Sequence, residues 1–143
     1  MPIPSFRPDG YLPEGLHLAT EAELMERFGK TTPRRQHLAG RMARWLELAR
    51  AVGARRLLVD GSFVTSKDEP GDIDAVVWVP TDLRRQIAGG RIAAIELEIM
   101  LRTREPEELF AAHSQEVWDG WVEFFSGTRE ADERRKGIVE VRL

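Results

Sequence analysis

The chain has no cysteine among its 143 residues, which excludes a disulfide framework, a thiol nucleophile and a zinc site built on cysteine thiolates. It also lacks a long hydrophobic run, because its apolar segments are of strand length and fall short of the roughly 18 residues that cross a bilayer. Residues 1–10 lack the basic and then apolar pattern of a secretory signal peptide. We therefore expect a soluble, cytoplasmic protein that does not bind membranes.

An excess of charge of one sign is missing as well. The 21 Lys and Arg residues nearly balance the 24 Asp and Glu residues, so the net charge is −3. This value excludes a basic coat for nucleic acid and an acidic tail, and any site for a polyanion must be local. Hydrophobic residues at 42% and charged residues at 31% are typical of globular chains. We expect a single domain over residues 1–143.

The first half of the chain predicts an N-terminal arm followed by two helices. Four prolines within residues 1–18 disfavour a helix or a central strand, so this segment is predicted as an extended arm packed on the body. Thr20 and Glu23 have the spacing of a capping box and start a short helix. Thr32 followed by Pro33 starts a longer amphipathic helix that ends near Gly53.

The rest of the chain alternates strands and helices. Apolar runs predict strands over residues 55–60, 72–79, 92–101 and 137–143, a short helix over 81–88, and one or two helices within 105–125 that break near Gly120. This order predicts an α/β (α+β) fold in which helices pack on a mixed sheet.

The most informative segment runs from Asp60 to Asp74. Gly61 and Ser62 at a strand end allow a tight turn that can present amides and a hydroxyl to a phosphate oxygen. Asp72 and Asp74 are two positions apart at the start of an apolar run, so strand pleating places both carboxylates on one face. Close carboxylates repel each other, and a magnesium ion with substrate phosphates relieves that repulsion. The alternative is that both are solvated turn residues.

The predicted strand 92–101 carries two further acids. Glu96 and Glu98 would project from one face of that strand, where one could complete the metal site and one could act as a general base. The solvent-facing side of an edge strand explains both glutamates equally well.

Other polar residues are weaker candidates. Thr65 could add a hydroxyl and Lys67 could neutralise a triphosphate, although a loop lysine is often only solvated. Two arginine-rich groups could face phosphate or RNA, or could simply be exposed; they are Arg129, Arg134 and Arg135 with Lys136, and Arg34, Arg35, Arg41 and Arg44. The four tryptophans are expected to anchor the core or an interface.

Gly61-Ser62, followed about ten residues later by Asp72-x-Asp74, resembles the signature of the polymerase-beta type of nucleotidyltransferase. The resemblance implies that Gly61 and Ser62 contact a nucleoside triphosphate. It also implies that Asp72 and Asp74 bind divalent metals, Mg²⁺ or Mn²⁺, with a third acid from a later strand. That acid is usually aspartate, so a glutamate there is a departure from the superfamily pattern.

Several further segments are similar to an uncharacterised bacterial family described as nucleotidyltransferase-like. They are Pro13–His17, Phe63–Thr65, Lys67, Pro70, Phe124–Phe125 and Lys136–Val139, together with the residues of the Gly-Ser and Asp-x-Asp motif. This similarity supports the fold and leaves the substrate open.

The leading hypothesis is a metal-dependent nucleotidyltransferase that moves a nucleoside monophosphate to a hydroxyl of a protein, an RNA or a small molecule. Resemblance to minimal members, many of which act in toxin–antitoxin pairs, favours a protein or tRNA acceptor, with a homodimer or a partner chain completing the cleft. The competing hypotheses are a non-catalytic module that binds nucleotide or protein while keeping the fold, and a purely structural partner of another chain.

Overall fold

A five-stranded mixed sheet forms the centre of the computed structural model, which describes residues 3–104, 108–128, 132 and 134–143. The strand order is β1-β5-β2-β3-β4. The strands are β1 (Gly15–Ala19), β2 (Arg56–Asp60), β3 (Asp74–Trp78), β4 (Leu109–Ala112) and β5 (Gly137–Arg142). The outer pairs, β1 with β5 and β3 with β4, are parallel, whereas β2 runs antiparallel to both of its neighbours. The predicted α+β class is confirmed.

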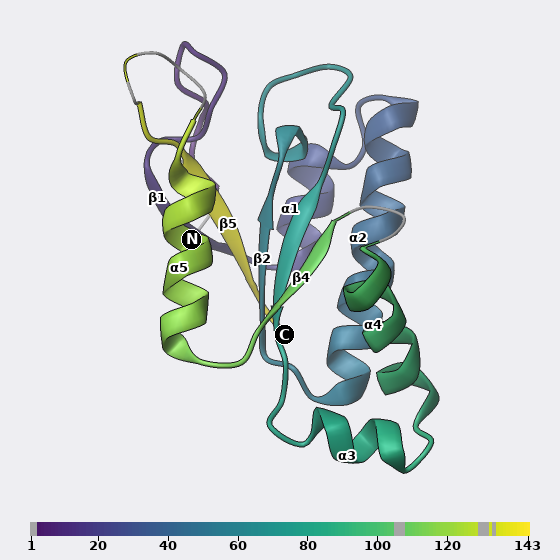
Figure 1. Ribbon diagram of the computed structural model, residues 1–143. Coiled ribbons are helices and arrows are strands. Elements are labelled where there is room, and N and C mark those ends of the chain that lie inside the picture. Colours follow the sequence, from purple (N-terminus) through teal and green to yellow (C-terminus); the bar gives the residue numbers. More distant parts are fainter. Residues whose placement is uncertain (1–2, 105–107, 129–131, 133) are drawn as a thin grey trace.

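Helices cover the two faces of the sheet unequally (Figure 1). The larger core lies between the sheet and the helices α1 (Glu21–Phe28), α2 (Pro33–Val52) and α4 (Ile92–Thr103), with the short α3 (Leu83–Ala88) beside it. A smaller core lies on the opposite face under α5 (Gln115–Ser126). Alternate strand residues enter the two cores: Leu57 and Val59 face the larger one, and Leu58 faces α5.

The predicted helix boundaries in the first half of the chain are confirmed. The hydroxyl of Thr20 accepts a hydrogen bond from the amide of Glu23 at 3.1 Å and starts α1. Thr32 caps α2 in the same way, and Gly53 ends it in the left-handed conformation. The arm packs on the body, as expected, and its last residues form the edge strand β1.

The prediction of a strand over residues 92–101 is wrong, because this segment is the helix α4. Its buried residues are Ala94 and Leu97, which are three positions apart and share one face of a helix. Ile95 and Ile99, which alternate with Leu97 in sequence, are 36% and 53% exposed. The alternation of Ile95, Leu97 and Ile99 in sequence therefore does not indicate which side chains are buried.

The prediction for residues 105–125 is partly wrong. Residues 109–112 form β4 instead of a helix, and Gly120 lies inside a continuous α5. Residues 105–107 fall outside the described part of the chain. None of the helices described is both long enough and apolar enough to cross a membrane.

Candidate functional site

A cavity of about 710 Å³ opens at one end of the sheet. The loop between β2 and β3 and the N-terminal arm both lie at this end, drawn at the top of Figure 1. Six residues predicted for the site line the cavity: Gly61, Ser62, Thr65, Lys67, Asp72 and Asp74. The other lining residues are Asp9, Gly10, Tyr11, Asp60, Ser66, Phe124, Phe125, Gly127, Thr128 and Lys136. The glycine-serine bend and the two aspartates therefore share one pocket.

The bend at Gly61 packs directly on the backbone of the Asp-x-Asp segment. Gly61 has φ +90°, a conformation that side chains rarely adopt. A Cβ atom there would lie 3.0 Å from the carbonyl oxygen of Asp72 and 3.0 Å from the Cα of Ile73. The amide of Phe63 donates to that same carbonyl at 3.0 Å. Only glycine allows this approach, which brings the two halves of the motif together.

Ser62 orients the carboxylate of Asp72. Its backbone amide and its hydroxyl donate to Oδ1 of Asp72 at 2.8 Å and 2.6 Å, while the hydroxyl accepts from the amide of Gly71 at 2.9 Å. Burial raises the pKa of Asp72, but the hydrogen bonds from Ser62 outweigh burial and the pKa lies below its ordinary value. Asp72 is therefore ionised at neutral pH, with its carboxylate held in one orientation.

Asp74 and Asp60 face each other across the antiparallel pair β2–β3. They share strand parity with Val76 and Leu58, so they lie on the α5 face of the sheet. Burial, together with the negative charges of Asp72, Asp60 and Glu108, raises the pKa of Asp74 to about 7. Among the described residues, none donates a hydrogen bond to its carboxylate.

Lys136 offsets part of this negative charge. It precedes β5 and donates a hydrogen bond from Nζ to Oδ1 of Asp60 inside the structure. Burial raises the pKa of Asp60, and the charge of Lys136 opposes that shift. The end of the sheet thus gathers three aspartates and one lysine that are far apart in sequence.

The sequence predictions did not assign Asp60 or Glu108 to the site, and they did not anticipate that Lys136 pairs with Asp60. The signal for Asp60 is its position, because an acid follows the buried run 57–59 and comes immediately before the Gly-Ser bend. Lys136 was assigned to a basic loop, and nothing near it in sequence indicates that it meets Asp60. Glu108 lies just before β4, where its carbonyl accepts from the amide of Ala75 at 3.1 Å, and β4 itself was not predicted.

Glu96 and Glu98 do not have the geometry predicted for a third acid. That prediction required a strand, in which residues two positions apart share a face. In the helix α4, residues two positions apart lie about 200° apart around the helix axis. Glu96 pairs with Arg44 of α2, and Glu98 pairs with Arg102. Neither lines the cavity. No cluster of three or more Asp, Glu or His residues with metal-binding geometry is found within the described residues.

Two arginines of α2 bind the loop that joins the Gly61-Ser62 bend to Asp72 and Asp74. Arg35 is only 4% exposed, so the interpretation of an exposed arginine stripe is wrong at this position. Its guanidinium donates to four backbone carbonyls, those of Phe28, Phe63, Thr65 and Lys67. Arg34 donates to the carbonyls of Pro70 and Gly71 at 2.9 Å and 2.7 Å. The loop between the bend and the aspartates is therefore fixed by side chains from α2.

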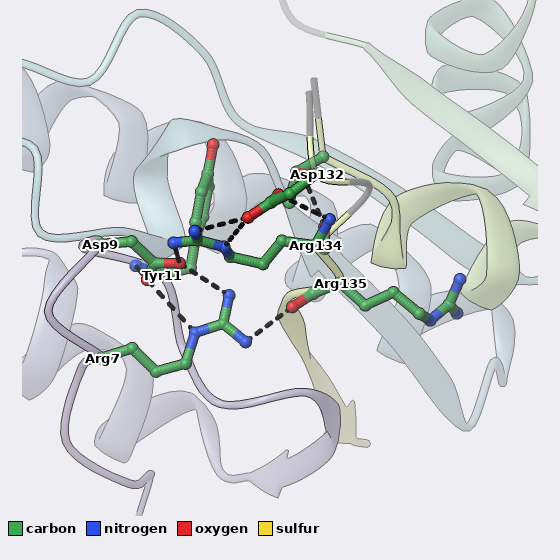
Figure 2. Close-up of polar contacts among 7 residues, drawn as sticks. Arg7, Asp9, Tyr11, Asp132, Arg134 and Arg135 are labelled. Atoms are coloured by element: carbon green, nitrogen blue, oxygen red, sulfur yellow. Dashed lines mark hydrogen bonds and ion pairs between the residues drawn. The ribbon is translucent and has the colours of Figure 1, made fainter. Parts of the chain in front are cut away.

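The N-terminal arm, whose residues Asp9, Gly10 and Tyr11 line the cavity, is held by the contacts drawn in Figure 2. Asp9 lies between Arg7 and Arg134, with carboxylate distances of 3.0 Å and 2.8 Å, and accepts from the amide of Tyr11 at 3.1 Å. Arg7 also donates to the carbonyl of Arg135 at 2.7 Å. We call Arg7, Asp9 and Arg134 the arm clasp.

The arm clasp corrects the prediction of a phosphate-facing basic loop. Arg134 is occupied by Asp9 and Asp132, and Arg135 by Glu14 and Glu123. Lys136 is the member of this predicted group that lines the cavity. Arg129 lies outside the described residues.

The fold and the cavity define an α+β domain with an aspartate-lined pocket at the end of its sheet. The chain belongs to a family of unknown function, DUF6932, whose pattern matches residues 4–142. Comparisons with curated proteins and with solved structures give no match.

Proposed function

We propose that this protein is a metal-dependent nucleotidyltransferase, which moves a nucleoside monophosphate from a nucleoside triphosphate to an acceptor hydroxyl. One observation carries the proposal: the carboxylates of Asp72 and Asp74 line the same cavity as the Gly61-Ser62 bend and two lysines, Lys67 and Lys136. Carboxylates are ligands for hard divalent cations, and lysines are point charges that bind phosphates. The cavity therefore combines the ligands needed for a metal–triphosphate complex.

The residues present fit a magnesium or manganese ion. Oδ1 of Asp72 is already bonded to Ser62, while its Oδ2 and the carboxylate of Asp74 receive no hydrogen bond from any described residue. Mg²⁺ commonly takes one or two carboxylates and completes its shell with waters and substrate phosphates, so a third protein acid is not required. Burial, and then repulsion by the neighbouring acids, raises the pKa of Asp74, and a bound cation would relieve that repulsion.

The chain's own residues would position the reactants. Lys67 is exposed in the loop and free to follow the phosphates, whereas Lys136 is fixed by its ion pair with Asp60. The bound cation would neutralise developing charge on the phosphoryl oxygens. The acceptor oxygen forms a bond to the α-phosphorus, the bond from that phosphorus to the α–β bridging oxygen breaks, and pyrophosphate leaves while the hydroxyl proton passes to water.

A nucleotide-binding module without catalysis is the second candidate. It is favoured by the position of Glu96 and Glu98 on α4, away from the cavity lining, and by the lack of a three-acid cluster in the described part of the chain. Such a module would use the same pocket and the same lysines. Both candidate functions therefore predict nucleotide binding, and only the enzyme predicts turnover.

Calorimetric titration of ATP, GTP, CTP and UTP, with and without Mg²⁺, tests binding. We expect binding that depends on Mg²⁺ and is lost in Asp72→Asn and Asp74→Asn. Glu69→Gln is a matched control, because Glu69 is an exposed acid of the same loop that does not line the cavity. Equal binding by all three variants would contradict both candidate functions.

Transfer of label from α-labelled triphosphates to proteins or RNA of a cell lysate separates enzyme from binding module. An enzyme labels an acceptor and releases pyrophosphate, and both signals vanish in Asp72→Asn and Asp74→Asn. Nucleotide binding without label transfer or pyrophosphate release would favour the module. Analysis of the labelled species also tests the expected protein or tRNA acceptor.

A further inference from the structure

Phe124 is an exposed aromatic residue at the edge of the cavity. Its side chain is 72% exposed, although it sits beside the buried Phe125 near the end of α5. It lines the cavity together with the acids and lysines of the sheet end. An exposed phenyl ring that borders a polar pocket presents a flat apolar surface to whatever occupies that pocket.

The ring of Phe124 rests on neighbouring aromatic side chains. Its centroid lies 6.0 Å from that of Trp121 in an edge-on arrangement and 5.9 Å from that of Phe125. Trp121 in turn packs 4.4 Å from Phe110 of β4. The Phe124 ring, the proposed stacking platform, is therefore supported by residues that pack against the sheet. This support limits the conformational entropy that the side chain loses when a ligand stacks on it.

Tyr11 supplies a second aromatic wall from the N-terminal arm. It lines the same cavity, and the Nζ atom of Lys136 lies 5.9 Å from the centre of its ring. The amide of Tyr11 donates to Asp9, which Arg7 and Arg134 hold in place (Figure 2). The arm clasp thereby fixes the backbone that carries this ring.

The cavity thus has a charged part and an aromatic part. Asp72, Asp74 and the lysines form the first, and Phe124 with Tyr11 forms the second. A volume of about 710 Å³ lies within the range of roughly 300–1,000 Å³ of pockets that bind small molecules. A nucleotide has the same two parts, a polyanion and a planar base.

We propose that the base of the nucleotide stacks on Phe124, with Tyr11 as the second wall, while the phosphates lie at the Gly61-Ser62 bend; this inference rests on the proposed function. Every base has a π face, so stacking tolerates all four bases. Affinity should therefore differ little among ATP, GTP, CTP and UTP, with purines somewhat tighter because they overlap the ring over a larger area.

Two probes separate the base from the phosphates: ATP, and inorganic tripolyphosphate, which lacks base and sugar. Both are titrated with Mg²⁺ into the full chain and into Phe124→Ala, Phe124→Trp and Ile92→Ala. Ile92 on α4 is also 72% exposed and does not line the cavity, so Ile92→Ala controls for loss of an exposed apolar side chain. Because Phe124 is exposed, its alanine variant should fold, and circular dichroism checks this.

Phe124→Ala should weaken ATP binding about 5- to 100-fold and leave tripolyphosphate binding unchanged. Phe124→Trp should keep or tighten ATP binding, and Ile92→Ala should leave both affinities unchanged. Unchanged ATP affinity in Phe124→Ala, or equal weakening of both probes, overturns the stacking platform while the proposed function stands. If Phe124→Ala instead dissociates a dimer without changing ATP affinity, the ring is a contact between copies. Failure of the wild type to bind either probe overturns the proposed function itself.

Discussion

The ammonium group of Lys136 donates a hydrogen bond to the carboxylate of Asp60, a residue 76 positions earlier in the chain. Their side chains are only 11% and 7% exposed. Removing one partner of such a pair leaves an uncompensated buried charge, so we expect Lys136→Met to lower the free energy of unfolding by about 3–5 kcal/mol. The double variant Asp60→Asn with Lys136→Met should recover a large part of that loss, as measured by urea unfolding. Equal stability of the single and the double variant would contradict the expected cost of an unpaired Asp60 carboxylate.

Gly61 is the residue whose replacement should disturb the site most through the backbone. Gly61→Ala adds a Cβ atom 3.0 Å from the backbone of Asp72 and Ile73 at a positive φ, and we expect a loss of about 2–4 kcal/mol. Mg²⁺-dependent nucleotide binding should be lost with it.

Gly40→Ala is the matched control for this prediction. Gly40 lies inside α2, and an added Cβ would meet nothing within 4 Å beyond its chain neighbours and the nearby backbone of its own helix, so alanine there should stabilise the protein by about 0.5–1 kcal/mol. Thermal unfolding of the two variants checks the expected opposite signs. Similar melting temperatures for both would contradict the close approach at the bend.

Features that depend on a few neighbouring residues could be predicted from the sequence. Local signals placed the caps at Thr20, Thr32 and Gly53 correctly, because a cap is decided by a few neighbouring residues. The resemblance of the motif to the polymerase-beta type of nucleotidyltransferase also predicted that Gly61 and Ser62 meet the two aspartates, and all four residues line one cavity.

Predictions that depended on distant contacts were less successful. The alternation of Ile95, Leu97 and Ile99 predicts a strand over 92–101, but Ala94 and Leu97 are buried in the larger core, where α4 packs on α2, and their spacing fits a helix. Arg35 was judged by its helix alone, whereas its partners are carbonyls of a loop about 30 residues later. Residues that meet only through the tertiary fold leave no local pattern to read.

Burial, together with repulsion by neighbouring acids, should make the ionised form of Asp74 unfavourable in the metal-free protein. Its pKa of about 7 in the folded state lies above the value of 3.8 expected when unfolded, so ionising it costs stability as the pH rises from about 4 through 7. Asp74→Asn removes that cost, and its melting temperature in a chelator should exceed the wild-type value by more at pH 8 than at pH 5. A smaller gain at pH 8 than at pH 5 would contradict the raised pKa of Asp74.

Arg35 should be essential for the loop between the bend and the aspartates. Arg35→Ala leaves four carbonyls without their shared donor, and we expect a loss of about 2–4 kcal/mol by urea unfolding. Arg35→Lys keeps the charge but cannot reach all four carbonyls, so it should restore little. Arg50→Ala is the control, because Arg50 is exposed and pairs only with Glu21 among the described residues; its effect should stay below about 1 kcal/mol. A loss in Arg35→Ala no larger than in Arg50→Ala would rule out this role.

The arm clasp makes a prediction about Asp9. The hydrogen bond from Arg134, helped by Arg7 and by the amide of Tyr11, lowers the pKa of Asp9 from 3.8 to about 2. A carboxyl with a lowered pKa in the folded state contributes stability that is present above pH 4 and is lost as the pH falls from about 4 towards 2. Arg134→Gln should raise the pKa of Asp9 towards its ordinary value, and high salt should shift it in the same direction because the pair is solvent-accessible. Titration of the Asp9 carboxyl carbon by NMR measures this shift, with Arg50→Gln as a variant that should leave it unchanged. An unaltered Asp9 titration in Arg134→Gln would contradict the contribution of Arg134 to the clasp and leave Arg7 as the partner that holds Asp9.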